Sequence, residues 1–404
     1  MGEGLTRIAA LDAAYHLPTY ARKPLLFVRG EGMRLYDDDG REYLDFVSGI
    51  GAVNLGHAHP AVADAVCDQM RRLVHVSNLY HVEHRAVLAK RLSVLAGGGW
   101  RAFFCNSGTE AVEGAIKLAR RWGKERRGDA CVEIVTAERS FHGRTFGALS
   151  ATGQASKQER FSPLLPGFTH VPLNDIGALE AAVTERTCAV LLEPVQGEGG
   201  VYPCDEAYLG AARRICDERE VLLVFDEVQS GFYRTGTPFA WQGYGVRPDV
   251  MTLAKAMANG LPAGAVLASG SAAEAFTPGD HGSTFGGGPV IAAAALATIS
   301  ALQDERLGEN AERVGAVLRE GLATLGRSTG ALAGVRGRGL MVAADLVQGV
   351  APLSAPALAE ACAQQGVIIN AIGDRTVRLL PPLVCSQDQT AILIDTLHAV
   401  LGGT

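Results

Sequence analysis

Near its middle the chain contains the run Val221-Leu222-Leu223-Val224-Phe225-Asp226-Glu227, in which five apolar residues are followed at once by two acids. A continuous apolar run of this length is typical of a strand that is buried on both faces of a parallel sheet. Asp226 then lies at the carboxyl end of the strand. Open α/β sheets bind their ligands at that edge, so the run predicts the type of sheet and the position of a site.

A lysine follows on the next expected strand. Residues 248–253 read Pro-Asp-Val-Met-Thr-Leu and predict a short strand that delivers Lys255 to the same edge. A buried carboxylate beside a lysine suggests a pyridoxal phosphate (PLP) site, in which the lysine would form a Schiff base and Asp226 would keep the pyridinium nitrogen protonated. Taken alone, the pair is also compatible with a structural salt bridge.

Composition sets the broad class of protein. The 404 residues, 48% hydrophobic and 20% charged, fit two globular domains or one large and one smaller domain. The net charge of -6 argues against a nucleic-acid or membrane surface as the main partner. Eight scattered cysteines without a C-x-x-C pair indicate buried thiols in a reducing compartment. No secretory signal is apparent, and the longest apolar stretch, 290–302, is too short to span a bilayer, so the expected location is the cytoplasm.

The order of the segments predicts an α/β fold. Residues 25–48 alternate around Asp39-Gly40, as in a small antiparallel unit. From about 60 to 280, apolar strands alternate with helical segments such as 111–122 and 206–219, which implies a mostly parallel sheet with helices on both faces. A helix-rich stretch, 289–326, leads into a final α+β portion. The strands expected in the large sheet are 101–105, 131–136, 188–193, 221–226, 250–253 and 264–268.

Two segments could bind phosphate. Asn106-Ser107-Gly108-Thr109-Glu110 follows an apolar strand and opens a helix, so free amides, hydroxyls and the helix dipole could hold an anion. Simple N-capping by the serine is the alternative. The glycine-rich loop 281–289 carries two more hydroxyls, on Ser283 and Thr284, but does not identify a phosphate site by itself.

Three further segments place polar groups near the sheet edge. Phe141 could stack on a planar ring and Arg144 could clamp a carboxylate, although the same loop could be an ordinary surface loop. Glu193 ends another apolar strand. Arg378 interrupts an apolar strand and must find a partner, either a structural acid or a substrate carboxylate.

Other site types lack their key residues. His57 with His59, and His81 with His84, have no convincing third ligand, so no metal site is predicted. The chain has no G-x-G-x-x-G after the first strand, no G-K-[ST] loop and no G-x-S-x-G elbow, which argues against nucleotide-binding and serine-hydrolase functions.

Taken in order, these motifs resemble the class III aminotransferases, which are PLP-dependent enzymes of fold type I, the aspartate aminotransferase-like fold. Six motifs carry the resemblance: Asn106-Ser-Gly-Thr-Glu-Ala, Phe141-His-Gly-Arg-Thr, Glu193-Pro-Val-Gln-Gly-Glu-Gly-Gly, Asp226-Glu-Val-Gln, Lys255, and His281-Gly-Ser-Thr-Phe-Gly-Gly. Within the family the chain is most similar to the acetylornithine aminotransferases, and the likeness runs nearly end to end.

The resemblance implies a role for each site residue. Lys255 would be the Schiff-base lysine and proton shuttle, Asp226 would pair with the pyridinium nitrogen, Gln229 would bind the ring 3-hydroxyl, and Phe141 would stack on the ring, with Val228 as a further cofactor contact. The phosphate would be held by Ser107, Gly108 and Thr109, and by Thr284 of a second subunit in a homodimer.

For the substrates, the resemblance makes Arg144 the ligand of the donor's α-carboxylate and Arg378 that of glutamate or 2-oxoglutarate. Ser283 would be a further substrate contact. Glu193 would neutralise Arg378 while the donor is bound and would swing away for the dicarboxylate. The implied reaction moves the terminal amino group of N2-acetylornithine to 2-oxoglutarate, a step of arginine biosynthesis.

Several alternatives stay open at this stage. The donor could be that of an ornithine, succinylornithine, 4-aminobutyrate or diaminobutyrate aminotransferase, and aminomutases and decarboxylases share the fold. A non-enzymatic binding protein would leave Lys255 beside Asp226 unexplained. Tyr233 and Gly288 depart from the family pattern and could reshape the substrate entrance. The expected domains are 1–55 (an N-terminal segment of the small domain), 56–288 (the large PLP-binding domain) and 289–404 (the C-terminal small domain).

Overall fold

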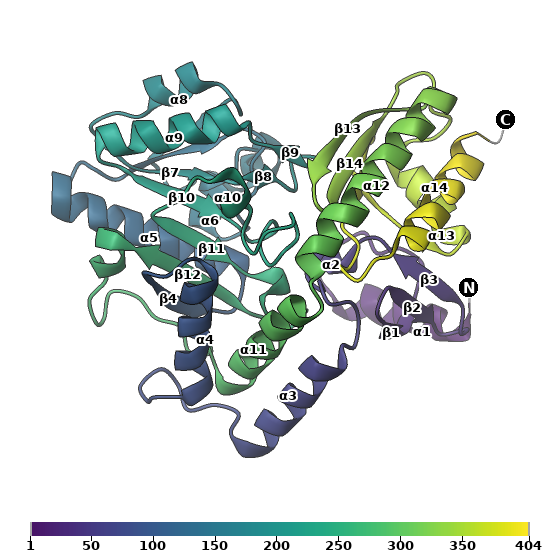
Figure 1. Cartoon of the computed structure of the whole chain (residues 1–404), viewed down its shortest axis with the longest axis horizontal. Coiled ribbons are helices and arrows are strands. Elements are labelled where there is room, and N and C mark those ends of the chain that lie inside the picture. Colours follow the sequence, from purple (N-terminus) through teal and green to yellow (C-terminus); the bar gives the residue numbers. More distant parts are fainter. Residues whose placement is uncertain (1, 403–404) are drawn as a thin grey trace.

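A computed structural model describes residues 2–402 and centres on a seven-stranded sheet in the order β4-β12-β11-β10-β7-β5-β6 (Figure 1). All its strands run in one direction except β12, which is antiparallel to both of its neighbours. The predicted mostly parallel sheet is therefore confirmed. The strands are β4 (Trp100–Cys105), β5 (Glu133–Ala137), β6 (Phe168–Val171), β7 (Thr187–Leu192), β10 (Leu222–Asp226), β11 (Val250–Leu253) and β12 (Gly264–Ser269).

Helices cover both faces of this sheet. On one face α5 (Gly108–Arg127) packs against alternate strand residues such as Leu191 and Val224. On the other face α9 (Glu206–Arg219) packs against their neighbours, including Leu192 and Phe225. Because successive side chains point to opposite faces, a central strand must be apolar at every position. Each fully buried aliphatic side chain contributes about 1.5–3 kcal/mol, which explains why continuous apolar runs identified these strands.

The two ends of the chain meet in one region. Strands β1 (Phe27–Glu31), β2 (Arg34–Asp37) and β3 (Glu42–Asp45) form the expected antiparallel unit, and β15 (Val367–Ile368) joins it by pairing in parallel with β3. Both termini lie on this side of the molecule (Figure 1). The N-terminal segment thus packs with the C-terminal portion. The domain boundaries stay a prediction, and residues 1, 403 and 404, at the ends of the first and last expected domains, lie outside the described residues.

A second sheet belongs to the C-terminal portion. Its order is β13-β14-β17-β16, with β13 (Leu332–Arg338), β14 (Met341–Leu346), β16 (Asn370–Ile372) and β17 (Thr376–Leu379). The long helix α12 (Leu307–Thr329) packs on β13 and on the last helix, α14 (Gln387–Leu401), while α13 (Ala355–Gln364) packs on β16. By contrast, α11 (Pro289–Asp304) packs on α3 (Pro60–Arg72) and α4 (Glu83–Leu95), beside the large sheet.

The remaining elements are short, apart from the N-terminal helix. They are α1 (Glu3–Tyr15), α2 (Ser48–Gly51), α6 (Phe146–Ala151), α7 (Ala155–Gln158), α8 (Ile176–Ala182), α10 (Ala240–Tyr244), the strands β8 (Val195–Gln196) and β9 (Tyr202–Pro203), and the 3-10 turns Glu159–Phe161, Lys255–Ala258 and Gly270–Glu274.

Arg234 joins three distant segments in the interior. Its guanidinium donates to the carbonyl oxygens of Leu340 and Pro381 and to the side-chain oxygens of Asn54 and Ser48. The side chain is completely buried, and this burial lowers the pKa of Arg234 to about 9. No carboxylate hydrogen-bonds this guanidinium within residues 2–402, so all of its hydrogen bonds go to neutral oxygens.

Other residues singled out by the sequence have structural roles. All eight cysteines are free, and only Cys67 is exposed. His57 bonds the buried Asp45, and His59 bonds Glu305. None of the helices described in residues 2–402 is long and apolar enough to cross a membrane.

Candidate active site

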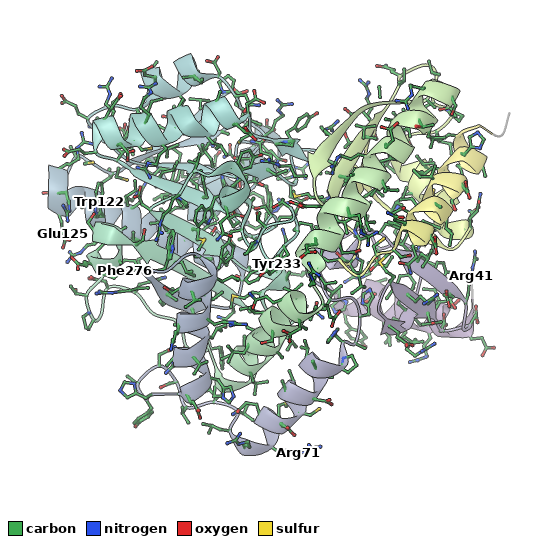
Figure 2. The ribbon with its side chains drawn as sticks, in the orientation of Figure 1. Arg41, Arg71, Trp122, Glu125, Tyr233 and Phe276 are labelled. Atoms are coloured by element: carbon green, nitrogen blue, oxygen red, sulfur yellow. The ribbon has the colours of Figure 1, made fainter. Side chains whose placement is uncertain are left out.

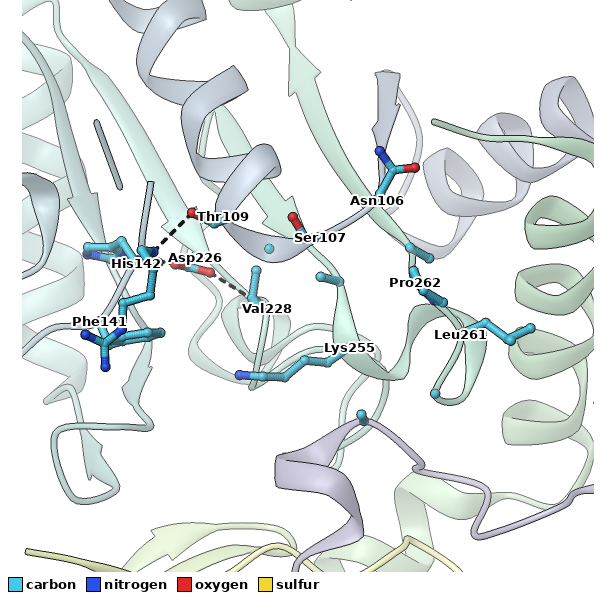
Figure 3. Close-up of a pocket in the computed structure, with 17 residues that line it drawn as sticks. Asn106, Ser107, Thr109, Phe141, His142, Asp226, Val228, Lys255, Leu261 and Pro262 are labelled. Atoms are coloured by element: carbon cyan, nitrogen blue, oxygen red, sulfur yellow. Dashed lines mark hydrogen bonds and ion pairs between the residues drawn. The ribbon is translucent and has the colours of Figure 1, made fainter. Parts of the chain in front are cut away.

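A cavity of about 400 Å³ opens at the carboxyl edge of the large sheet (Figure 3). Its walls come from the segments that follow β4, β5, β10 and β11, together with residues 260–263 just before β12. Asp226 and Lys255 both line it. The structure therefore brings together the acid and the lysine that the sequence placed at one sheet edge.

Asp226 is a buried acceptor with several donors. The hydroxyl of Thr252 donates to Oδ1 at 3.0 Å, and the backbone N–H of Val228 donates to the same oxygen at 3.1 Å. Nδ1 of the buried His142 lies 2.8 Å from Oδ2. These contacts fix the orientation of the carboxylate, as a hydrogen-bond partner of a protonated ring nitrogen requires. The neighbouring Glu227 has another role, because it accepts the backbone N–H groups of Ala240 and Trp241 at the start of α10.

Lys255 extends across the cavity toward the wall formed by Asp226 and Phe141 (Figure 3). Its backbone has φ +46°, a left-handed conformation that is rare and costly for a residue with a side chain. Burial lowers the pKa of Lys255, although Glu198 and Asp226 oppose this effect. A lysine amine with a lowered pKa is more often neutral, which is the state needed by a nucleophile or base.

The start of α5 forms the floor of a cup. The Ser107 hydroxyl accepts the N–H of Glu110, so the serine is the N-cap that the alternative interpretation expected. The N–H groups of Gly108 and Thr109 come next and point out of the first helical turn, where an anion binds favourably. The Thr109 hydroxyl is already engaged, since it accepts the N–H groups of Arg144 and Thr145.

Glycines allow the walls to pack closely around the cup. A Cβ on Gly108 would lie 2.8 Å from Val228, and one on Gly143 would lie 2.3 Å from the Thr109 hydroxyl oxygen. With an amide cup at one end, the Asp226 carboxylate on the far wall, the Phe141 ring at the side and Lys255 across the opening, the residues fit PLP. Ser107, Gly108 and Thr109 would hold its phosphate.

The prediction that Glu193 contacts Arg378 is wrong. The buried Glu193 carboxylate accepts the backbone N–H groups of Phe141 and Gly197, at 2.9 and 3.0 Å. Burial raises the pKa of Glu193 to about 7. Arg378 instead forms an ion pair of 2.6 Å with Glu198, which sequence reasoning missed. Burial alone would raise the pKa of Glu198, but Arg378 and Lys255 hold it below its usual value.

Replacing Glu198 with glutamine should favour dicarboxylates over diamino donors. The neutral amide would leave the Arg378 charge unpaired when a donor is bound, while a dicarboxylate would still supply a partner. We expect the ratio of kcat/KM for glutamate to that for the amine donor to rise about tenfold, the size of one charged hydrogen bond.

Glu193→Gln is the matched control for this measurement. Its carboxylate faces two backbone N–H groups and not Arg378, so the ratio should stay within about twofold of the parent value. If Glu193→Gln changed the ratio of kcat/KM values more than Glu198→Gln did, Glu193 and not Glu198 would be the residue that neutralises Arg378 while the donor is bound.

Five of the expected site residues lie outside this cavity, and Glu193 has been described above. The Gln229 amide donates to Glu198 and lies beside Arg378. Ser283 accepts the side-chain N–H of Asn106, and Thr284 is exposed. The last is Arg378 itself, which is held by Asn370 in addition to Glu198. The roles given above to Gln229, Ser283 and Thr284 therefore stay predictions.

The two departures from the family pattern do not line the cavity either. Tyr233 packs between helices, beside Gln303 and Arg91, with Cδ1 2.7 Å from the position of a Cβ on Gly308 (Figure 2). Gly288 is the residue before α11. The interpretation that Tyr233 reshapes the entrance is not supported by its position, because the helix packing accounts for it.

The chain matches the family described as Aminotransferase class-III over residues 17–401. It is 49% identical to an acetylornithine aminotransferase of Gloeobacter violaceus, over 95% of this chain and 94% of that protein. It is 44% identical to an acetylornithine aminotransferase of Caldanaerobacter subterraneus subsp. tengcongensis, over 96% and 98% of the two chains.

Solved structures agree with this relationship. The ornithine aminotransferase from Toxoplasma gondii, in a structure with partial occupancy of PLP at its active site, superposes with a TM-score of 0.93. That structure has 32% sequence identity over 98% of this chain and 95% of the other. The sequence match, the fold and the cavity lead to one conclusion: the chain belongs to the class III aminotransferases and is a PLP-dependent aminotransferase.

Proposed function

We propose that the enzyme transfers the terminal amino group of N2-acetylornithine to 2-oxoglutarate, giving the semialdehyde and glutamate. The observation that carries the proposal is the near full-length similarity, 44–49% identity, to relatives named acetylornithine aminotransferase. Arg144 lines the cavity, and Arg378 is ion-paired with Glu198. These two arginines support a reaction in which two carboxylate-bearing substrates bind in turn.

The residues divide the work as follows. When bound, PLP would supply an electron sink and a carrier for the amino group. Asp226 would hold a proton on the ring nitrogen, and His142 fixes the orientation of the Asp226 carboxylate. The Lys255 amine removes and returns the proton at the carbon that carries the transferred group, since its lowered pKa leaves it able to act as a base. Phe141 and Val228, which line the cavity, would enclose the ring.

We further infer a homodimer in which Thr284 reaches the phosphate in the partner's site. Thr284 and Phe285 are exposed on this chain, as are Leu79 and Tyr80, and Asn78 bonds the backbone of Ser283 and Gly286. Large exposed apolar side chains gathered around one loop are typical of an interaction surface. The proposed role is biosynthetic, in arginine formation, and the proposed location is the cytoplasm. The domain division at 55 and 288 is part of the same proposal.

A donor comparison tests the function. With 2-oxoglutarate as acceptor, N2-acetylornithine should give glutamate with a kcat/KM at least about tenfold above that of N-acetylputrescine, because the latter lacks only the carboxylate that Arg144 would bind. Glutamate formed per unit time is the measurement. Ornithine and 4-aminobutyrate are included as competing donors, and a higher efficiency with either would overturn the assignment of the donor.

A further inference from the structure

The lysine turn, Lys255–Ala258, is a single 3-10 turn that begins just after β11 and ends at Asn259. Figure 3 shows Lys255 at the start of this turn and Leu261 beyond its end. Short 3-10 turns have poor hydrogen-bond geometry, so their own hydrogen bonds position them weakly. The sheet fixes one end of the lysine turn, and the position of the other end depends on contacts outside the turn.

Asn259 supplies such contacts. Its backbone has φ +45° and ψ +53°, the left-handed conformation that glycine and asparagine adopt more readily than other residues. Its side-chain oxygen accepts the backbone N–H of Leu55 at 2.9 Å, and its side-chain N–H donates to the carbonyl oxygen of Gly56 at 3.0 Å. The asparagine therefore ties the lysine turn to segment 52–57, which is far away in the sequence.

Segment 52–57 is itself held firmly on its other sides. The side-chain oxygen of Asn54 accepts a hydrogen bond of 2.6 Å from the buried Arg234. The ring of His57 bonds the buried carboxylate of Asp45 at 2.8 Å. Because the segment is fixed to the interior in this way, it can serve as a rigid support for the lysine turn.

The contact between the two segments lies beside the cavity. Ala52 lines the cavity, and so do Gly260 and Leu261, which follow Asn259 directly. A Cβ on Gly260 would lie only 2.9 Å from Cγ1 of Val53, so the two segments pack closely here. A shift of Asn259 against segment 52–57 would therefore displace the end of the lysine turn relative to the cavity wall.

We propose that Asn259 is a positioning residue for Lys255. By joining the lysine turn to segment 52–57, it holds the lysine amine where it can react with the cofactor. Lys255 has a strained backbone, with φ +46°, and such a conformation persists only where the surrounding structure enforces it. Asn259 does not line the cavity, so it acts through Lys255. This inference rests on the role that the proposed function gives to Lys255.

Asn259→Gly tests the side chain by itself, because glycine adopts the same left-handed backbone without strain and lacks both hydrogen bonds. We expect kcat to fall about tenfold, since a small displacement of a reacting group has a large effect on rate. The KM values for N2-acetylornithine and 2-oxoglutarate should stay within about twofold of the parent values, because substrate binding is unchanged.

Asn310→Ala is the matched control. This asparagine is also half-buried and also bonds two backbone groups of a distant segment, the carbonyl oxygens of Leu383 and Cys385, but it does not line the cavity. Asn259→Gly and Asn310→Ala should both lower the thermal stability, because each loses two hydrogen bonds. In Asn310→Ala, however, kcat should stay within about twofold of the parent value.

Attachment of the cofactor supplies a readout that does not depend on turnover. PLP is added to the full-length chain after its cofactor has been removed, and borohydride traps the PLP attached to Lys255 at successive times. The rate of attachment should be about tenfold lower in Asn259→Gly. The affinity for pyridoxamine phosphate, which cannot react with a lysine, should stay within about twofold, because the amide cup at the start of α5 is intact.

Parent-like kcat and attachment rate in Asn259→Gly would overturn the role of Asn259, even if the protein were less stable. A parallel loss of pyridoxamine phosphate binding would also overturn it, because the whole cavity would then be displaced. Full activity of Lys255→Ala would instead overturn the role of Lys255 and this inference with it. If Asn259→Gly does not fold, Asn259→Asp replaces it. Its carboxylate still accepts the Leu55 N–H and loses only the donor to Gly56, and kcat should fall at unchanged KM.

Discussion

Replacing Lys255 with alanine is expected to lower the rate of transamination by at least about 10²–10⁴-fold, the range typical of a lost general acid–base group. The side chain that crosses the cavity carries the only lysine amine among the residues lining it in the described chain, so no neighbour can take over the proton transfer. Glutamate formation from N2-acetylornithine and 2-oxoglutarate is the measurement. Lys90→Ala, at an exposed position on α4, is the control.

Chemical rescue separates a lost amine from a damaged fold. A small primary amine added to Lys255→Ala should restore part of the activity, because it can occupy the space vacated by the side chain.

The Lys255→Ala protein also tests whether the active site is shared between two subunits. Mixed with an inactive Thr284→Asp protein, it should regain activity through hybrid dimers that contain one intact site. A rate for Lys255→Ala within tenfold of the parent would remove Lys255 from the chemistry.

Replacing Arg378 with alanine should selectively damage the dicarboxylate half-reaction. The side chain is only 2% exposed and is positioned by Asn370 on one side and Glu198 on the other. Loss of one member of a buried hydrogen-bonded charge pair costs about 2–5 kcal/mol, so conversion of glutamate to 2-oxoglutarate should slow by roughly 10²–10³-fold. Conversion of N2-acetylornithine to the semialdehyde should slow by less than about tenfold, since in the proposed function Arg144 would hold that substrate.

Single-turnover measurement of each product separates the two half-reactions. Arg378→Lys is the matched variant, because it keeps the charge and loses the planar fork that binds a carboxylate with two parallel hydrogen bonds. It should fall between the parent and Arg378→Ala in the glutamate half-reaction. Equal losses in both half-reactions would mean that Arg378 serves the structure and not one substrate.

The sequence was informative wherever burial forces a pattern. Central strands such as β10 and β7 are apolar except at one end, at Asp226 and Thr187, because helices cover both of their faces, and the inward residues of α5 follow from helical spacing. Strand β6, Phe168–Val171, was missed. It lies at the edge of the sheet and alternates with polar residues, so its sequence resembles a loop. The reversed direction of β12 was likewise not visible, because an apolar run carries no sign of its orientation.

The partner of Arg378 could not be predicted from the sequence. Glu193 and Glu198 lie in one glycine-rich loop after β7, and either could reach an arginine from another domain. Which one does so depends on backbone N–H groups: those of Phe141 and Gly197 take up Glu193, which leaves Glu198 for the arginine. His142 was underestimated for a similar reason, because only the fold shows that it meets Asp226. Its position next to Phe141 in the family motif was the available signal.

The buried Arg234 has a consequence for how the protein denatures. Its acceptors lie in the N-terminal segment, at Ser48 and Asn54, and in the C-terminal portion, at Leu340 and Pro381, while the arginine itself follows β10 of the large sheet. Separating these parts would leave a desolvated guanidinium without partners, or would require water to enter the core. Partial opening is therefore penalised along with complete opening. Domains that share a solvated charge in this way lose their structure in one cooperative transition, and neither half retains the other's stability after a cut in the chain.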